Sequence, residues 1–191
     1  MLKFVDNGGR NGIIKNIGID NIYPKDYKGT IKREVAEEIN KVIQKRNATS
    51  LFDGAKIVKI NSKNVLQTEV IQNGTFFDVV LNINENALGG KTIQEIDDMF
   101  KGASSTIANT LEEAVIHEEF HARLVAGLNY AQVEALYDEL SDIHIGGISK
   151  IAYADGAECI PETGVLIVRN ETDKIPEEAL NLFKKYIRGV I

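Results

Sequence analysis

The sequence contains almost no cysteine: Cys159 is the only one among 191 residues. A single thiol cannot form a disulfide within the chain, so a small secreted fold held by disulfides is excluded. A metal site made of several thiolates is excluded as well. Any metal bound by this chain would therefore be held by imidazole and carboxylate groups, a ligand set more typical of catalytic than of structural sites.

Long apolar runs are also missing. No stretch approaches the roughly 18 consecutive apolar residues that a membrane-spanning helix requires, and residues 1–9 contain no apolar run of signal-peptide length. From the sequence we therefore expect a cytoplasmic or virion-associated protein without a membrane partner.

The chain lacks an excess of basic residues. Lysine and arginine number 22 against 28 aspartates and glutamates, which gives a net charge of −6. A surface that binds nucleic acid needs a basic excess, so nucleic acid is not expected as a partner. The hydrophobic fraction of 43% is enough for a packed core, and the length fits one domain.

The pattern of apolar residues predicts an α+β fold. Residues 1–29 are rich in glycine, asparagine and aspartate and are expected to form an arm or a loosely structured segment, with a single domain over 30–191. The domain should begin with a helix over about 31–46, followed by a small three-stranded sheet, partly a meander. Capping patterns then predict several helices: 92–102, 110–127, one from Asn129 through Leu140 that is broken by Gly146 and Gly147, about 157–168, and one from Pro176.

Only three histidines are present, and two of them form the motif His117-Glu118-Glu119-Phe120-His121. This is H-E-x-x-H within a predicted helix, where residues four apart share one face, so both imidazoles can reach one ion. Glu118 sits beside that ion without binding it and is suited to act as a general base. The pattern predicts a zinc site.

A catalytic zinc ion needs a third protein ligand. Glu158 and Glu162 are four residues apart on a predicted helix, so that one could bind the metal while the other supports a ligand. Six downstream side chains are possible ligands: Asp142, His144, Asp155, Glu158, Cys159 and Glu162.

The H-E-x-x-H motif and the segment from Ile148 to Glu162 resemble a group of small, gluzincin-type zincin metallopeptidases. This group includes the catalytic domain of anthrax lethal factor, the Pro-Pro endopeptidases and zincin domains of phage minor head proteins. The last are the most similar to this chain, over roughly residues 75–190. The resemblance implies a zincin domain with a short mixed or antiparallel sheet, and an active-site helix followed by further helices.

Carried over to this chain, the resemblance implies that His117, His121 and Glu158 bind zinc, that Glu118 is the general base and that Glu162 supports the ligands. It also implies that Tyr153 stabilises the oxyanion. Three positions depart from the family pattern: Tyr153 lies five rather than seven residues before the third ligand, Pro161 replaces a helix former, and Glu119 adds a second carboxylate.

Small zincins bind their substrate as an additional strand at the edge of the sheet. Residues 76–84 form the predicted strand nearest in sequence to the H-E-x-x-H helix and are the candidate for that edge, and the alternative is that they form an ordinary core strand. The side chains that would contact the peptide are Phe76, Phe77, Val79 and Leu81. The leading hypothesis is thus a zinc-dependent endopeptidase acting on a protein or peptide. The alternative is a catalytically silent zincin-fold module of phage or mobile-element origin that binds zinc and serves in structure or protein interaction.

Overall fold

The computed structural model describes residues 3–6 and 22–187, and for 3–6 only the backbone. Its strands are β1 (Lys3–Asp6), β2 (Gly54–Val58), β3 (Leu66–Asn73) and β4 (Phe76–Asn84). Its helices are α2 (Arg33–Lys45), α3 (Glu85–Leu88), α4 (Ile93–Lys101), α5 (Leu111–Val125), α6 (Tyr130–Ser141), α7 (Gly156–Val168), a 3-10 turn (Thr172–Lys174) and α8 (Glu177–Tyr186). The predicted α+β class is confirmed.

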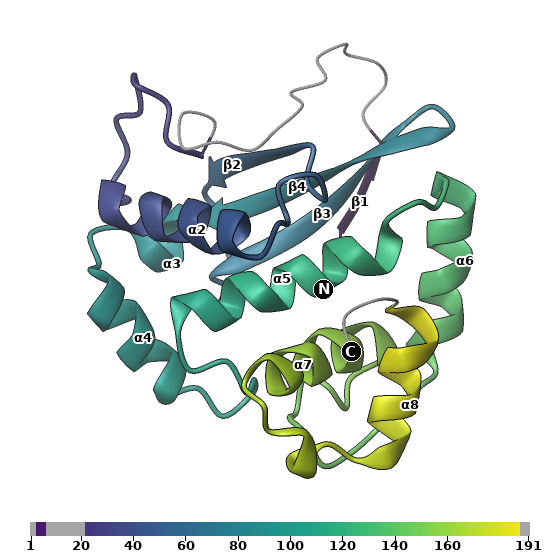
Figure 1. Cartoon of the computed structure of the whole chain (residues 1–191). Coiled ribbons are helices and arrows are strands. Elements are labelled where there is room, and N and C mark those ends of the chain that lie inside the picture. The colour runs from purple at the N-terminus through teal and green to yellow at the C-terminus, as the bar shows by residue number, and fades with distance from the viewer. Residues whose placement is uncertain (1–2, 7–21, 188–191) are drawn as a thin grey trace.

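The sheet is mixed and has the order β1-β3-β4-β2 (Figure 1). Strands β3 and β4 form an antiparallel hairpin, and Gly74 in its turn has a φ of 68°, which favours glycine. Both outer strands run parallel to their neighbours, β1 to β3 and β2 to β4. The sheet therefore has one strand more than predicted, and β2 pairs with β4 instead of continuing a meander.

The segment 1–29, expected as an arm, differs in part from that expectation. Residues 3–6 form β1 and pair with Glu69–Gln72 of β3, while Ile22 is fully buried. Residues 7–21 lie outside the described part. The composition of this segment does not reveal that residues 3–6 form a strand, because the pairing of a four-residue parallel strand depends more on its partner strand than on its own sequence.

The two faces of the sheet differ in polarity. Val70, Leu81 and Ile83 are fully buried on the face that α5 covers, whereas the other face carries buried polar groups, among them Glu69 and Asn82. There the Glu69 carboxylate accepts hydrogen bonds from Asn82 and from Lys56. This alternation fixes the register, since a slip of one residue would exchange the two faces.

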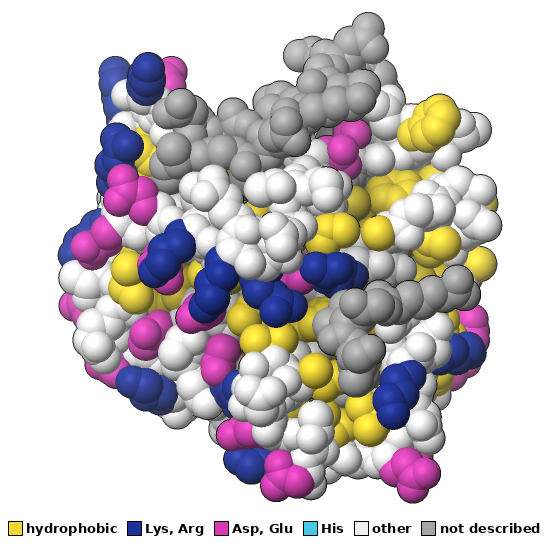
Figure 2. All heavy atoms as spheres, viewed as in Figure 1, with side chains coloured by type: hydrophobic (Ala, Val, Ile, Leu, Met, Phe, Trp, Pro, Cys, Tyr) yellow, Lys and Arg dark blue, Asp and Glu magenta, His cyan; other side chains and the backbone are white. Residues whose placement is uncertain are grey.

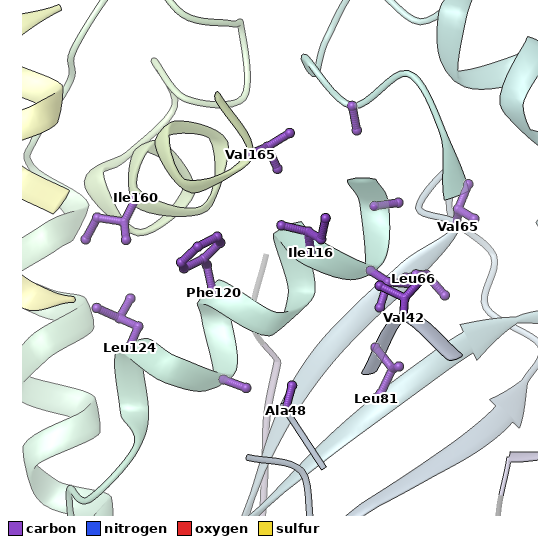
Figure 3. Packing of buried hydrophobic residues seen from close by; sticks show 14 of the residues in the cluster. Val42, Ala48, Val65, Leu66, Leu81, Ile116, Phe120, Leu124, Ile160 and Val165 are labelled. Carbon is purple, nitrogen blue, oxygen red and sulfur yellow. The ribbon is translucent and has the colours of Figure 1, made fainter. Parts of the chain in front are cut away.

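Helix α5 lies at the centre of the fold, between the sheet and α7 (Figure 1). It begins at Thr110, whose side chain accepts a hydrogen bond from the N–H of Glu113, and nearly all of its sides are buried. In Figure 3, Ile116 and Phe120 of α5 lie beside Ile160 and Val165 of α7. A helix enclosed on all sides can carry polar groups only where they find partners.

The predicted helices are confirmed with small shifts at their ends. Capping boxes form at Thr92 and at Asn129, as expected. The box predicted at Thr110 is only half formed, because the Glu113 carboxylate instead accepts from the N–H of Asn109 and from Arg169. Helix α7 begins at Gly156, so Pro161 falls in its second turn, where it has no N–H to donate to the carbonyl of Ala157.

The surface in Figure 2 mixes acidic and basic side chains, and none of the three histidines is visible on that face. Among the described helices none is long and apolar enough to cross a membrane.

Candidate metal centre

Two imidazole groups meet on one face of α5. His117 and His121 are one turn apart, and their Nε2 atoms lie 3.2 Å from each other. The ring centroids are 4.9 Å apart with an interplanar angle of 70°. The spacing of four residues in a regular helix thus brings both nitrogens to one point, as the sequence predicts.

Helix α7 supplies a carboxylate to the same point. Asp155 caps the helix by accepting a hydrogen bond from the N–H of Glu158, which fixes Glu158 in the first turn. Glu158 Oε2 lies 3.3 Å from His117 Nε2 and 3.6 Å from His121 Nε2. The side chains of His117, His121 and Glu158 are only 12%, 3% and 10% exposed. This buried group could hold a metal ion.

Glu162 lies one turn further along α7 and orients His117. Its Oε1 is 3.1 Å from His117 Nδ1 and also accepts from the Thr106 hydroxyl, while Oε2 accepts from the N–H of Ile107. An ionised carboxylate only accepts hydrogen bonds, so Nδ1 of His117 carries the proton. In the neutral ring this leaves the Nε2 lone pair directed toward Glu158 and His121. Carboxylates commonly orient metal-binding histidines in this way.

The charged groups of the candidate metal centre shift one another's pKa values. Burial disfavours a charge on His117, but hydrogen bonds to Glu158 and Glu162 outweigh it and raise the pKa of His117 to about 10. Burial also opposes ionisation of Glu158, yet the charge of His121 and the hydrogen bond from His117 lower the pKa of Glu158 well below its usual range. Without a metal, a proton on His117 balances the carboxylates, and a metal ion would compete with that proton.

Glu118 is positioned by the sheet. Its Oε2 accepts a hydrogen bond of 2.5 Å from the backbone N–H of Thr68, and the Thr68 hydroxyl donates to the Glu118 carbonyl. The side chain is 8% exposed and lines the same cleft as His117 and Glu158. Strand β3 therefore fixes this carboxylate next to the candidate metal centre.

Glu119, the extra carboxylate of the motif, points elsewhere. It is 1% exposed, and both of its oxygens accept hydrogen bonds from arginines. Arg46 approaches Oε2 at 2.6 Å and Oε1 at 3.2 Å, and Arg123 approaches Oε1 at 2.6 Å. Its charge is neutralised within its own group of residues, which we call the arginine cluster.

The two helices that carry the ligands pack very closely. A Cβ atom at Gly164 of α7 would lie 2.3 Å from the ring of Phe120, so only glycine fits at this crossing. The Phe120 ring also contacts Phe183 of α8 edge-on, with centroids 5.3 Å apart. This contact sets the distance between α5 and α7, and with it the distance between the histidines and Glu158.

A cleft of about 450 Å³ opens onto the centre. Its floor includes His117, Glu118 and Glu158. The walls come from the residues before and at the start of β3, from the end of α4 and the segment after it, and from the turn before α7: Lys63–Leu66, Met99, Phe100, Ala103, Ser105, Thr106, Ala108, Lys150, Ile151, Ala154 and Asp155. Backbone groups join two of these walls, because the N–H of Ile151 donates to the carbonyl of Ser105.

The structure brings together five of the predicted site residues, His117, Glu118, His121, Glu158 and Glu162. Three other possible ligands lie away from the centre. Asp142 and His144 are exposed, and Nδ1 of His144 faces the Tyr153 carbonyl. Cys159 is buried on another side of α7, and burial raises the pKa of its thiol to about 11, so it stays protonated.

The position of Tyr153 corrects one prediction. Tyr153 is 58% exposed and packs against the His144 ring, with centroids 5.8 Å apart. It borders a separate shallow depression beside Gly146 and Gly147 rather than the cleft. The reason is local: Tyr153 belongs to a turn that closes with its N–H donating to the Ser149 carbonyl, and this turn directs the ring outward.

The predicted substrate edge is also wrong. Strand β4 lies between β3 and β2 in the sheet, and β2 pairs with Val80–Asn84. Phe76 and Phe77 precede that pairing, but they lie at the hairpin end of the strand, opposite to the end that pairs with Leu66 beside the cleft. Val79 and Leu81 are buried in the core, while Phe76 is 76% exposed at the hairpin tip. Proximity in sequence to α5 does not identify the neighbouring strand, because the hairpin places β3, not β4, beside α5.

Sequence reasoning missed two contributors to the site. The first is Thr68, which holds Glu118 through its backbone N–H. A backbone contact of this kind does not depend on the residue type, so the sequence could not have predicted it. The second is Tyr137 of α6, whose hydroxyl is buried. Burial, followed by the charges of Glu158, Asp155 and Glu118, raises the pKa of Tyr137 well above its usual range. Tyr137 occupies an inward position of α6 one turn from Leu140, and that spacing is the signal that could have identified it.

Comparison with known proteins supplies no relative: the chain matches no protein family, no curated protein and no solved structure.

Proposed function

We propose that this protein is a zinc-dependent endopeptidase. The observation that carries the proposal is the convergence of His117, His121 and Glu158 at the floor of a cleft, with the Glu118 carboxylate fixed beside them. A site that only stabilised the fold would not need an open cleft or a further carboxylate held in place by the sheet.

The donor set favours zinc. For ligands about 2.0–2.2 Å from one ion at tetrahedral angles, neighbouring donor atoms are about 3.3–3.6 Å apart. The three distances between the donor atoms are 3.2, 3.3 and 3.6 Å. Two imidazoles and one carboxylate are typical of catalytic zinc, which keeps its fourth position for water.

Each residue has a defined task in this proposal. When bound, zinc supplies a Lewis acid that lowers the pKa of water and polarises a peptide carbonyl. The Glu118 carboxylate takes the proton from the attacking water and delivers it to the departing amine. Glu162 keeps the proton of His117 on Nδ1, so that Nε2 stays available.

The outer side of β3 is suited to hold a peptide. The N–H of Thr68 points away from β4, since it donates to Glu118, and alternation along an antiparallel pair directs the backbone groups of Leu66 the same way. Leu66 lines the cleft. We assign the substrate-binding edge to Leu66–Thr68, where the backbone groups of Leu66 would align the peptide, since the N–H of Thr68 is already bound to Glu118.

Tyr137 is better suited than Tyr153 to act near the reacting atoms. Its buried hydroxyl lies within electrostatic reach of Glu158 and Glu118, and its raised pKa keeps it protonated as a donor. Tyr137 does not line the cleft, so in this proposal it influences the charges of Glu158 and Glu118 from behind them and does not touch the substrate.

A second function, a metal-binding module without turnover, is favoured by one observation. The tyrosine at the family's approximate position, Tyr153, is exposed outside the cleft. Under this reading, the metal would hold α5 against α7 and the cleft would bind a protein segment without cutting it.

The test combines metal analysis with peptide cleavage. Purified protein should contain one zinc ion per chain and should cleave members of a peptide library. Glu118→Gln should retain the zinc and lose cleavage. Zinc without cleavage in the wild type would favour the second function, and a protein unable to bind zinc would exclude both.

A further inference from the structure

The cleft carries two lysines on different walls. Lys63 precedes β3, and Lys150 belongs to the turn that leads to α7. Both side chains are exposed, and within the described residues neither ammonium group forms an ion pair. Both differ in this respect from Lys56, which binds Glu69 outside the cleft.

The acidic residues of the cleft already have partners. Glu118 accepts from Thr68, Glu158 lies against the two histidines, and Asp155 caps α7. These hydrogen bonds hold the carboxylates in place but do not remove their charge, whereas the two ammonium groups are in no ion pair among the described residues and can turn toward a ligand.

The rest of the cleft is largely apolar. Its lining includes the apolar residues Val65, Leu66, Phe100, Ala108 and Ile151. A volume of about 450 Å³ can enclose one or two side chains of a peptide. Because these walls offer few hydrogen bonds, an apolar side chain would gain most from entering.

We propose that the cleft selects peptides in which an apolar residue at the cleaved bond is flanked by an acidic residue. This inference rests on the proposed peptidase function and names its substrate class. The remainder of the molecule carries net negative charge and repels such peptides, so the attraction has to come from Lys63 and Lys150.

The test uses the full-length, zinc-loaded protein and quenched fluorescent peptides that share an apolar centre. Their flanking residues are aspartate, serine or lysine. We expect kcat/KM to be about tenfold higher for the aspartate peptide than for the lysine peptide, mainly through KM, with the difference shrinking as salt is added.

Charge-reversal variants test whether Lys63 and Lys150 cause the preference for an acidic flanking residue. Lys63→Glu and Lys150→Glu should each lower the aspartate-to-lysine ratio several-fold, and the double variant should invert it. Lys184→Glu on α8, an exposed lysine outside the cleft, is the matched control and should leave the ratio unchanged. If a glutamate variant fails to fold, Lys63→Gln and Lys150→Gln remove the charge with less repulsion.

A binding measurement separates this inference from the peptidase proposal. Fluorescence anisotropy of the same peptides on Glu118→Gln requires no turnover. Tighter binding of the aspartate peptide supports the inference even where the wild type cleaves nothing. Equal binding and equal cleavage of all three peptides would overturn it, as would an effect of Lys184→Glu as large as that of the cleft lysines.

Discussion

Two neighbouring glutamates on α5 belong to opposite kinds of environment. Glu119 enters the arginine cluster, where every carboxylate oxygen meets a donor from Arg46 or Arg123. Glu118 and the histidines face the other way, toward Glu158. There the two Nε2 atoms and a carboxylate oxygen lie 3.2–3.6 Å from one another.

The two clusters differ in whether their charged and polar groups find partners within the protein. In the arginine cluster both oxygens of the Glu119 carboxylate accept hydrogen bonds from guanidinium groups, and the remaining positive charge lies on arginines that are 21% and 26% exposed to water. The candidate metal centre brings acceptors together, which is unfavourable unless a proton or a metal ion lies between them. Buried charges that satisfy one another stabilise a fold, whereas converging acceptors at an open cleft indicate a binding site.

The largest expected effect is on catalysis at Glu118. Glu118→Gln should lower peptide cleavage by about 10²- to 10⁴-fold, because a carboxamide cannot accept the proton. The glutamine carbonyl can still accept from Thr68, so zinc content and melting temperature should stay near those of the wild type. Retained cleavage would remove Glu118 from the proposed mechanism.

Glu119→Gln tests the other side of the helix. We expect the free energy of unfolding to fall by about 2 kcal/mol, less than the roughly 3–5 kcal/mol for fully buried pairs. The discount reflects the side chains of Arg46 and Arg123, which are 21% and 26% exposed. Urea unfolding measures the loss, while kcat per folded molecule should be unchanged. A loss of turnover without destabilisation would contradict the comparison.

Glu162→Gln examines the support behind His117. We expect zinc affinity, measured by competition with a chelator, to fall about 10- to 100-fold, because the amide no longer fixes the proton on Nδ1. Glu113→Gln is the control, since Glu113 binds Arg169 near the same loop but does not contact His117. Equal losses of affinity in both variants would mean that the loop, rather than the proton on Nδ1, matters.

Gly164→Ala disturbs the distance between the two helices. The added methyl group would meet the Phe120 ring, and we expect a loss of about 1–3 kcal/mol in unfolding free energy with weaker zinc binding. Gly54→Ala is the matched control, because nothing lies within 4 Å of a Cβ atom there. Calorimetry with and without zinc measures both effects. Wild-type zinc affinity in a destabilised Gly164→Ala would show that the ligands tolerate helix movement.

The smallest effect is expected from Tyr137→Phe. Loss of one hydrogen bond donor should lower kcat about five- to tenfold, with zinc content and melting temperature little changed. Tyr153→Phe, outside the cleft, should have no effect on kcat. The reverse result would restore Tyr153 to the role implied by the resemblance.

The candidate site was more predictable than the sheet. His117, Glu118 and His121 share a short helical segment, so a local rule fixes their relation. The residues alone left Glu158 among six possible third ligands, and only the resemblance selected it. Strand order depends on pairing between distant segments. Neither the parallel addition of β1 nor the interior place of β4 leaves a local pattern, and the direction of Tyr153 depends on one turn.

The register of β1 sets a limit on the other side of β3. Within the described residues, pairing begins with Lys3 opposite Glu69, and Leu66–Thr68 of β3 lie before that pair. A guest chain lying along this edge runs into the protein's own first strand after about three residues, or roughly 10 Å. Strand β1 thus limits the length of a segment that can pair with β3, because removing β1 would extend the open edge of β3 as far as Gln72.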